Sequence, residues 1–160
     1  MISFQKLRYK NFLSTGDVFT ELDLTKSEST LVVGQNGAGK STFLDALTFA
    51  LYNRPFRNIS KPQLVNSING KGLLVELEFH TGNQQVLVKR GIKPNVFQIW
   101  QNDIMLNQEA NNRDYQKILE QQILKLNYRS FTQVVILGSS TFVPFMQLKA
   151  RFRREVVEDL

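Results

Sequence analysis

The chain has 160 residues, enough for one domain that buries about two-thirds of its unfolded surface without disulfides. With 42% hydrophobic and 21% charged residues it is not a disordered chain, and its longest mostly apolar stretch, 43–52, is too short for the ~20 residues of a membrane helix. It contains no cysteine, which excludes disulfides and thiolate sites, and its net charge of +6 favours polyanions such as nucleotides or DNA as partners. The N-terminus has no apolar signal-peptide core, so we expect an intracellular protein.

The first third of the chain reads as strands, turns and one helix. Residues 2–9 and 18–24 have strand character and are separated by the turn-like segment 14–17. The run 30–33 is short and continuously apolar, which predicts a strand buried on both faces. Residues 40–52 are apolar over most of a helical circumference, so we expect a helix buried between layers.

The middle of the chain alternates with a period of two. Residues 73–79, 85–90 and 96–100 are separated by glycine-containing turns, which predicts an antiparallel meander. In the first of these strands the alternation places Glu76 and Glu78 on the solvent face.

The last third mixes helix and strand signals. A short strand is expected at 104–106, and the helical spacing of apolar residues predicts an amphipathic helix over 113–126. The apolar run 134–137 predicts another buried strand, and 149–160 predicts a helix.

One segment carries a complete chemical motif. The sequence Gly34-Gln35-Asn36-Gly37-Ala38-Gly39-Lys40-Ser41 matches G-x-x-x-x-G-K-[ST], between an apolar strand candidate and an apolar helix. Glycines let the backbone N–H groups wrap around a phosphate, and the helix N-terminus adds a positive dipole end. Lys40 is expected to reach the β- and γ-phosphates, the Ser41 hydroxyl to ligate Mg²⁺, and Thr42 to donate to the α-phosphate. The alternative is a glycine-rich helix-entry turn with an incidental lysine, which this context disfavours.

The groups that ATP hydrolysis needs in addition to the loop are not found in the sequence. Hydrolysis also needs a carboxylate at the end of an apolar strand to hold Mg²⁺ and a group that polarises the attacking water. The segments 73–76 and 156–159 contain acidic residues, but the first belongs to the meander and the second to a helical pattern. We therefore expect the chain alone to be an incomplete and inactive ATPase.

With the loop placed, its surroundings resemble a known family. Residues 7–12, 34–47 and 51–52 are similar to the N-terminal lobe of SbcC-type ATPases, the ABC/SMC-like large subunits of DNA double-strand-break nuclease complexes. Residues 131–137 and 144–160 resemble most the form found in T-even-type phages. The resemblance covers nearly the whole chain.

The resemblance implies an α/β P-loop NTPase fold of ABC/SMC type. Residues 1–160 would form the N-terminal lobe of a bilobed head, with a meander and a mixed sheet, and 149–160 would begin a coiled coil. Two heads would sandwich two ATP molecules with Mg²⁺. The implied partners are the C-terminal lobe, a second head in a homodimer, a Mre-type nuclease subunit and double-stranded DNA, but no membrane. The location would be cytoplasmic, in the host cell if the protein is phage-encoded.

The resemblance also assigns individual residues. The catalytic positions would be Lys40 and Ser139. Family members usually carry a glutamine that contacts Mg²⁺ and the γ-phosphate, and Ser139 is the residue closest to that position. This departure puts γ-phosphate sensing in question. Leu13 replaces an arginine that cellular members often carry, so contacts to the base would be apolar or main-chain. The nucleotide-binding set implied in this way is Gln35, Asn36, Gly37, Ala38, Gly39, Lys40, Ser41, Thr42, Asn11, Leu13, Val65 and Ser67, with Ser41 as the metal ligand.

Two other functions remain open at this stage. A small P-loop kinase would share the loop, but would be expected to carry arginine-rich lid segments and an acidic residue near its acceptor, and the meander after the loop helix favours the ABC type instead. A non-catalytic DNA-binding or scaffold module would bind no nucleotide.

Overall fold

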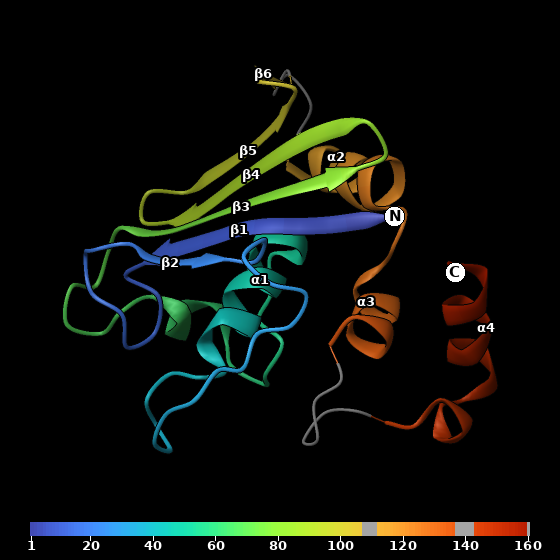
Figure 1. Cartoon of the computed structure of the whole chain (residues 1–160), viewed down its shortest axis with the longest axis horizontal. Helices are drawn as coiled ribbons and strands as arrows, with labels where there is room; N and C mark the ends of the chain where they lie inside the picture. Colours follow the sequence, from blue (N-terminus) through green and yellow to red (C-terminus); the bar gives the residue numbers. More distant parts are fainter. Residues whose placement is uncertain (107–111, 137–142, 160) are drawn as a thin grey trace.

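One antiparallel sheet forms the upper layer of the molecule (Figure 1). The computed structural model describes residues 1–106, 112–136 and 143–159. Within these ranges the strand order is β2-β1-β3-β4-β5-β6, and every neighbouring pair is antiparallel. The strands are β1 (Ile2–Lys10), β2 (Thr20–Asp23), β3 (Leu73–Thr81), β4 (Gln84–Ile92), β5 (Val96–Gln101) and β6 (Ile104–Met105). The strands predicted over 2–9, 18–24 and 104–106 and the antiparallel meander are confirmed.

The strand register sorts apolar and charged residues onto opposite faces of the sheet. Leu77 of β3 lies opposite Leu7 of β1 and Val88 of β4, and all three are buried. Successive residues of a strand point to opposite faces of the sheet. The residues that precede or follow these three in sequence therefore lie on the other face, where charged side chains are found. Glu76 lies there between Arg8 and Lys89, with ion pairs at 2.5 and 3.6 Å.

The prediction for Glu76 was therefore correct about its face but wrong about its exposure. Its side chain is only 7% exposed because the flanking cations of the neighbouring strands cover it. Cross-strand pairs of opposite charge stabilise such a face by up to about 1 kcal/mol each.

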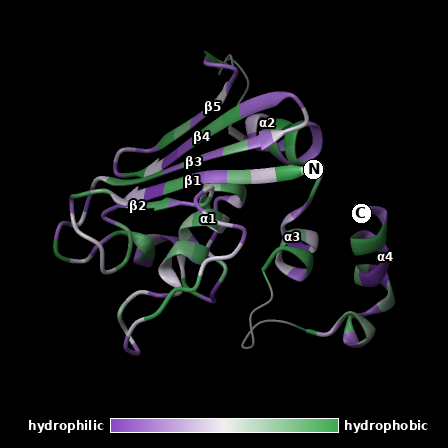
Figure 2. Cartoon of the chain, in the orientation of Figure 1, coloured by the Kyte–Doolittle hydropathy of each residue, from purple (hydrophilic) through white to green (hydrophobic). Residues whose placement is uncertain are grey.

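Helix α1 (Thr42–Tyr52) packs beneath the sheet and is buried over nearly its whole length, as predicted. Figure 2 shows that it is largely hydrophobic. Phe49 contacts the ring of Phe12 with centroids 5.9 Å apart, which fixes the helix against the turn after β1. The helix ends at Tyr52 and is capped by Asn53, whose backbone is left-handed with φ 59°. That conformation is typical of a residue just past a helix C-terminus.

The predicted helix over 113–126 is present as two consecutive segments. Helix α2 (Asn112–Lys117) continues into η2 (Ile118–Leu124), a segment with π-helical hydrogen bonding. The Tyr115 hydroxyl accepts a hydrogen bond from the Ile99 N–H at 3.0 Å, which ties α2 to β5. Short 3-10 turns, η1 (Lys61–Leu64) and η3 (Phe145–Gln147), occur elsewhere in the chain.

The C-terminal part is helical and is held together by polar contacts. Helix α3 (Tyr128–Val134) begins at Asn127, and α4 (Ala150–Glu158) confirms the helix predicted over 149–160. Asp159 accepts from the Ser130 hydroxyl at 2.6 Å, and Glu155 forms an ion pair with Arg129 at 3.0 Å. The coiled coil expected from this helix stays a prediction. None of the helices in the described ranges is long and apolar enough to cross a membrane.

Two predicted strands are wrong, and the mixed sheet is not found among the described residues. Residues 30–33 have no regular structure, and Leu31, Val32 and Val33 are 84%, 39% and 83% exposed. Val134 ends α3, while Val135 and Ile136 follow it outside any strand; the remaining predicted residue, Leu137, lies outside the described ranges. An apolar run becomes a parallel strand only where neighbouring strands and covering helices bury it.

Candidate functional site

The predicted phosphate loop, residues 34–41, turns tightly into α1. Gly37 and Gly39 both have φ +85°, a left-handed conformation that residues with a Cβ rarely adopt. The Ala38 N–H donates to the Gln35 carbonyl at 3.1 Å, and the Thr42 N–H donates to the Gly39 carbonyl at 3.0 Å. The glycine spacing in the sequence thus sets the curvature of the loop.

The side chains predicted to bind phosphate and magnesium lie where the helix begins. The Lys40 ammonium donates to the Gly34 carbonyl and, at 3.2 Å, to the Gln35 carbonyl. Ser41 is the exposed N-cap residue of α1, and Thr42 is buried in the first turn. Because the first N–H groups of a helix have no partner within the helix, this end favours an anion.

A hollow of about 410 Å³ opens beside the loop. Its lining contains six of the predicted loop residues and, from the turn after β1, the predicted Leu13. The full lining is Leu13, Ser14, Asn36, Gly37, Gly39, Lys40, Ser41, Thr42, Arg57 and Ile59. Gln35 and Ala38 belong to the loop but do not line this hollow. The structure therefore brings Leu13 and the loop together, although they lie far apart in the sequence.

Three predicted nucleotide-binding residues, Asn11, Val65 and Ser67, do not line the hollow. Asn11 is buried, and its amide donates to Asp17 and to the Gly72 carbonyl. Val65 pairs with Phe12 in an isolated bridge, and Ser67 is exposed outside the hollow's lining. Their assignment to the nucleotide stays a prediction.

Asn66, which the sequence analysis missed, positions Leu13. Its side-chain amide donates to the carbonyls of Leu13 and Thr15 at 3.0 and 3.1 Å. Leu13 itself has φ +52°, an unusual conformation for a leucine. We infer that these bonds hold the turn that carries Leu13 in a strained shape at the edge of the hollow.

Arg57 is the second residue that the sequence analysis missed, and it lines the hollow with Lys40. Asp45 of α1 is fully buried, and its carboxylate forms an ion pair with the Arg57 guanidinium at 2.6 Å. It also accepts a hydrogen bond from the Arg57 backbone N–H at 2.9 Å. The Arg57 side chain is 40% exposed, so it is fixed at one end and open at the other. An acidic residue in an otherwise apolar helix requires a partner, and this signal in the sequence could have found Arg57.

The hollow offers cations but no carboxylate. Among the described residues Lys40 and Arg57 are its only charged lining residues. Ser41 supplies one hydroxyl that fits Mg²⁺, an ion that binds through oxygen ligands including substrate phosphates. No group of three or more potential metal ligands of the His, Cys, Asp or Glu type occurs in the described part of the chain. Ser139, predicted as a catalytic residue, lies outside the described residues.

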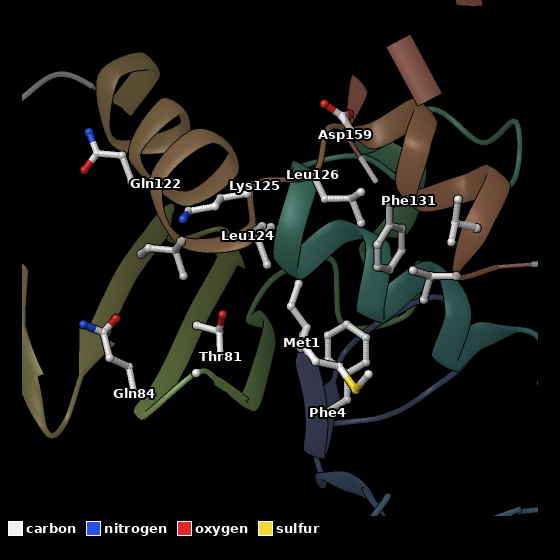
Figure 3. Close-up of a pocket in the computed structure, with 15 residues that line it drawn as sticks. Met1, Phe4, Thr81, Gln84, Gln122, Leu124, Lys125, Leu126, Phe131 and Asp159 are labelled. Atoms are coloured by element: carbon white, nitrogen blue, oxygen red, sulfur yellow. The ribbon is translucent and has the colours of Figure 1, made fainter. Parts of the chain in front are cut away.

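A larger hollow lies elsewhere and differs in character. It measures about 1010 Å³ and is formed by the start of β1, the β3–β4 turn, the end of η2 and helix α3. Figure 3 shows Phe4, Leu124, Leu126 and Phe131 around it, with Asp159 near its edge. We call it the apolar hollow. Its lining suits packing against protein better than binding a phosphate.

Comparison with solved structures identifies the fold. A chain described as "Structural biochemistry of ATP-driven dimerization and DNA stimulated activation of SMC ATPases" superposes with a TM-score of 0.63 at 20% identity, covering 98% of both chains. At that identity the likeness shows the fold alone, which the chain shares with this SMC ATPase structure.

The chain belongs to the AAA domain family, whose model matches residues 6–159. It is 45% identical to exonuclease subunit 2 of Enterobacteria phage T4 over 97% of its length, and 29% identical to a component of the nuclease SbcCD of Clostridium acetobutylicum over 86%. It spans 28% and 13% of the lengths of these relatives. The resemblance to SbcC-type ATPases is confirmed.

Proposed function

We propose that residues 1–160 are the N-terminal lobe of a bilobed ATPase head that binds Mg²⁺-ATP and belongs to a DNA recombination and repair nuclease. The observation that carries this proposal is the phosphate loop at the N-terminus of buried α1, with Lys40 beside a hollow. The phage and SbcCD relatives support the nuclease assignment. The protein would act in the cytoplasm, that of the host cell if it is phage-encoded.

The geometry suits a triphosphate because it gathers positive charge without any acidic residue in the described lining. The loop N–H groups would donate hydrogen bonds to phosphate oxygens, and the positive end of the α1 dipole would attract them. Lys40, which here donates to two loop carbonyls, would donate to the phosphate oxygens instead. Arg57 adds a second cation at a position set by Asp45. Ser41 would supply one oxygen ligand to the magnesium ion.

Hydrolysis would require the rest of the protein. Phosphoryl transfer depends on electrostatic completion of the site by acidic and water-positioning groups, which the described hollow does not contain. The exposed run 31–33 and the apolar hollow are surfaces that a C-terminal lobe would cover. We further propose that two such heads form a homodimer, with a Mre-type nuclease subunit and double-stranded DNA as partners.

Calorimetric titration with ATP, with and without Mg²⁺, tests nucleotide binding. Lys40→Ala should weaken binding at least a hundredfold, because it removes a cation from a site where several oxyanions converge. Lys26→Ala is the matched control, since Lys26 is exposed and lies outside the hollow's lining. Equal affinities of wild type and Lys40→Ala would overturn the proposal.

A second measurement tests the division into lobes. The chain alone should hydrolyse ATP at background rate, and the C-terminal lobe added as a separate chain should restore turnover. Robust turnover by the wild-type chain alone, lost in Lys40→Ala, would show that this lobe already contains a complete active site.

A further inference from the structure

Three hollows adjoin one another, and every charged residue in their described linings is basic. The phosphate-loop hollow shares Arg57 with a second hollow of about 260 Å³, which shares Lys61 with a third of about 570 Å³. We call the second and third together the basic cleft. Its charged lining residues are Arg54, Arg57, Lys61, Arg90, Arg113 and Lys117; no Asp or Glu lines it among the described residues.

Arg90 places a buried positive charge in this cleft. It is only 4% exposed, and its Nε donates to the Ala50 carbonyl at 2.9 Å. Its Nη2 donates to the Gln116 side chain at 2.7 Å, and its guanidinium stacks 3.7 Å from the Phe97 ring centre. Within the described ranges no carboxylate lies at ion-pair distance from it. A buried charge is usually paired, whereas Arg90 reaches Glu120 through Gln116, whose amide donates to Glu120 at 2.6 Å. The described lining of the cleft itself therefore keeps an excess of positive charge.

The pKa values of Arg90 and Lys61 are both lowered, chiefly by desolvation. Burial lowers the pKa of Arg90, and the charge of Glu120 only partly opposes the shift. Burial also lowers the pKa of Lys61, and the neighbouring Arg90 lowers it further. Both groups would therefore be stabilised in their charged form by an anion.

A structural role explains only part of the cluster. Arg90 binds a carbonyl near the C-terminus of α1, which stabilises that helix. Arg54 stacks on Tyr128, and Lys117 pairs with Asp114 of its own helix at 3.5 Å. Lys61, by contrast, forms no ion pair with any carboxylate that the structure describes, although it joins the two hollows of the cleft. The residue is exposed, so its ammonium is open to an anion at the junction of the two hollows.

We propose that the basic cleft is a second phosphate site that receives backbone phosphates of nucleic acid. This inference rests on the proposed role in DNA processing and gives it a location. A polymer is favoured over a single free phosphate because the cations are spread over two joined hollows. The phosphates of a nucleic-acid backbone repeat their negative charge along the strand in the same way. Such contacts position a nucleic acid without reading its sequence.

Binding of a duplex oligonucleotide at several salt concentrations tests the site on the full chain. The double variant Lys61→Gln/Lys117→Gln should bind roughly fiftyfold more weakly near ~0.1 M salt, with the slope of log K against log salt reduced by about two. The control Lys26→Gln/Lys71→Gln removes the same charge from exposed residues outside the cleft and should change affinity less than about twofold. Inorganic tripolyphosphate serves as a second probe, titrated in the same way.

The outcomes separate the two proposals. Equal effects of the site and control pairs, or no duplex binding by wild type, would overturn the nucleic-acid site. Binding of tripolyphosphate but not duplex, lost in the site pair, would assign the cleft to free polyphosphates and also overturn it. ATP affinity should be unchanged in the site pair, so a failed cleft leaves the nucleotide site standing. Failure of Lys40→Ala to weaken ATP binding would refute the nucleotide site without affecting the duplex result.

Discussion

The phosphate-loop hollow and the apolar hollow differ in what holds their walls in place. The first is walled by backbone turns and cations, and Arg57 and Leu13 are fixed by the buried polar partners Asp45 and Asn66. The second is walled mainly by side chains such as Phe4, Leu124 and Phe131. Hydrogen bonds and ion pairs have direction, whereas apolar packing does not. Substitutions in the first should therefore change binding, while substitutions in the second should change stability.

The largest expected effect on stability is at Phe131. It is buried, with its ring centre 5.2 Å from that of Tyr52 and 6.3 Å from that of Phe4. Phe131→Ala should lower the free energy of unfolding by about 3 kcal/mol, measured by urea denaturation. ATP affinity at a temperature where the variant is folded should not change. Val135→Ala, a half-exposed neighbour, should cost less than about 0.5 kcal/mol. A large loss of ATP affinity in Phe131→Ala would contradict the distinction between the two hollows.

Arg57→Ala should affect both properties. Removing the guanidinium leaves Asp45 buried with only the backbone N–H, at a cost of about 2 kcal/mol. ATP should bind about tenfold more weakly, because a charge-assisted contact to phosphate is lost. Arg54→Ala is the control, since it removes a cation from the same segment but outside the phosphate-loop hollow. Equal ATP affinity in both variants would restrict Arg57 to a structural role.

Ser139 is expected to give the smallest effect. If it replaces the family's glutamine, Ser139→Ala in the full-length protein should reduce ATP turnover a few-fold while leaving binding nearly intact. That pattern is typical of an interaction made mainly in the transition state. Steady-state kinetics with separate nucleotide-binding measurements would check it. Unchanged turnover would show that this serine has no sensing role.

Much of the fold followed from local patterns. The period of two in 73–79 gave the correct core face, because each inward residue meets an inward neighbour on both adjacent strands. The loop motif predicted both the turn and the start of α1, since glycines and a helix N-terminus are local features. These elements need no information from distant parts of the chain.

The errors concern segments whose structure depends on neighbours. Residues 30–33 and 134–137 have strand composition, but composition cannot supply the partner strands that a parallel sheet requires. Around Val134 a helix signal was available in Asn127, whose side chain accepts from the Ser130 N–H at 3.0 Å as an N-cap. Arg57 was missed because its partner Asp45 lies twelve residues earlier, across the end of a helix.

The edges of the sheet have a consequence for behaviour in solution. Both edge strands are very short, with four residues in β2 and two in β6, and short edges offer little template for pairing between molecules. The exposed apolar run 31–33 has no such protection. Aggregation of the isolated chain should therefore begin at this run, and a charged residue at Val33, as in Val33→Lys, should raise its solubility.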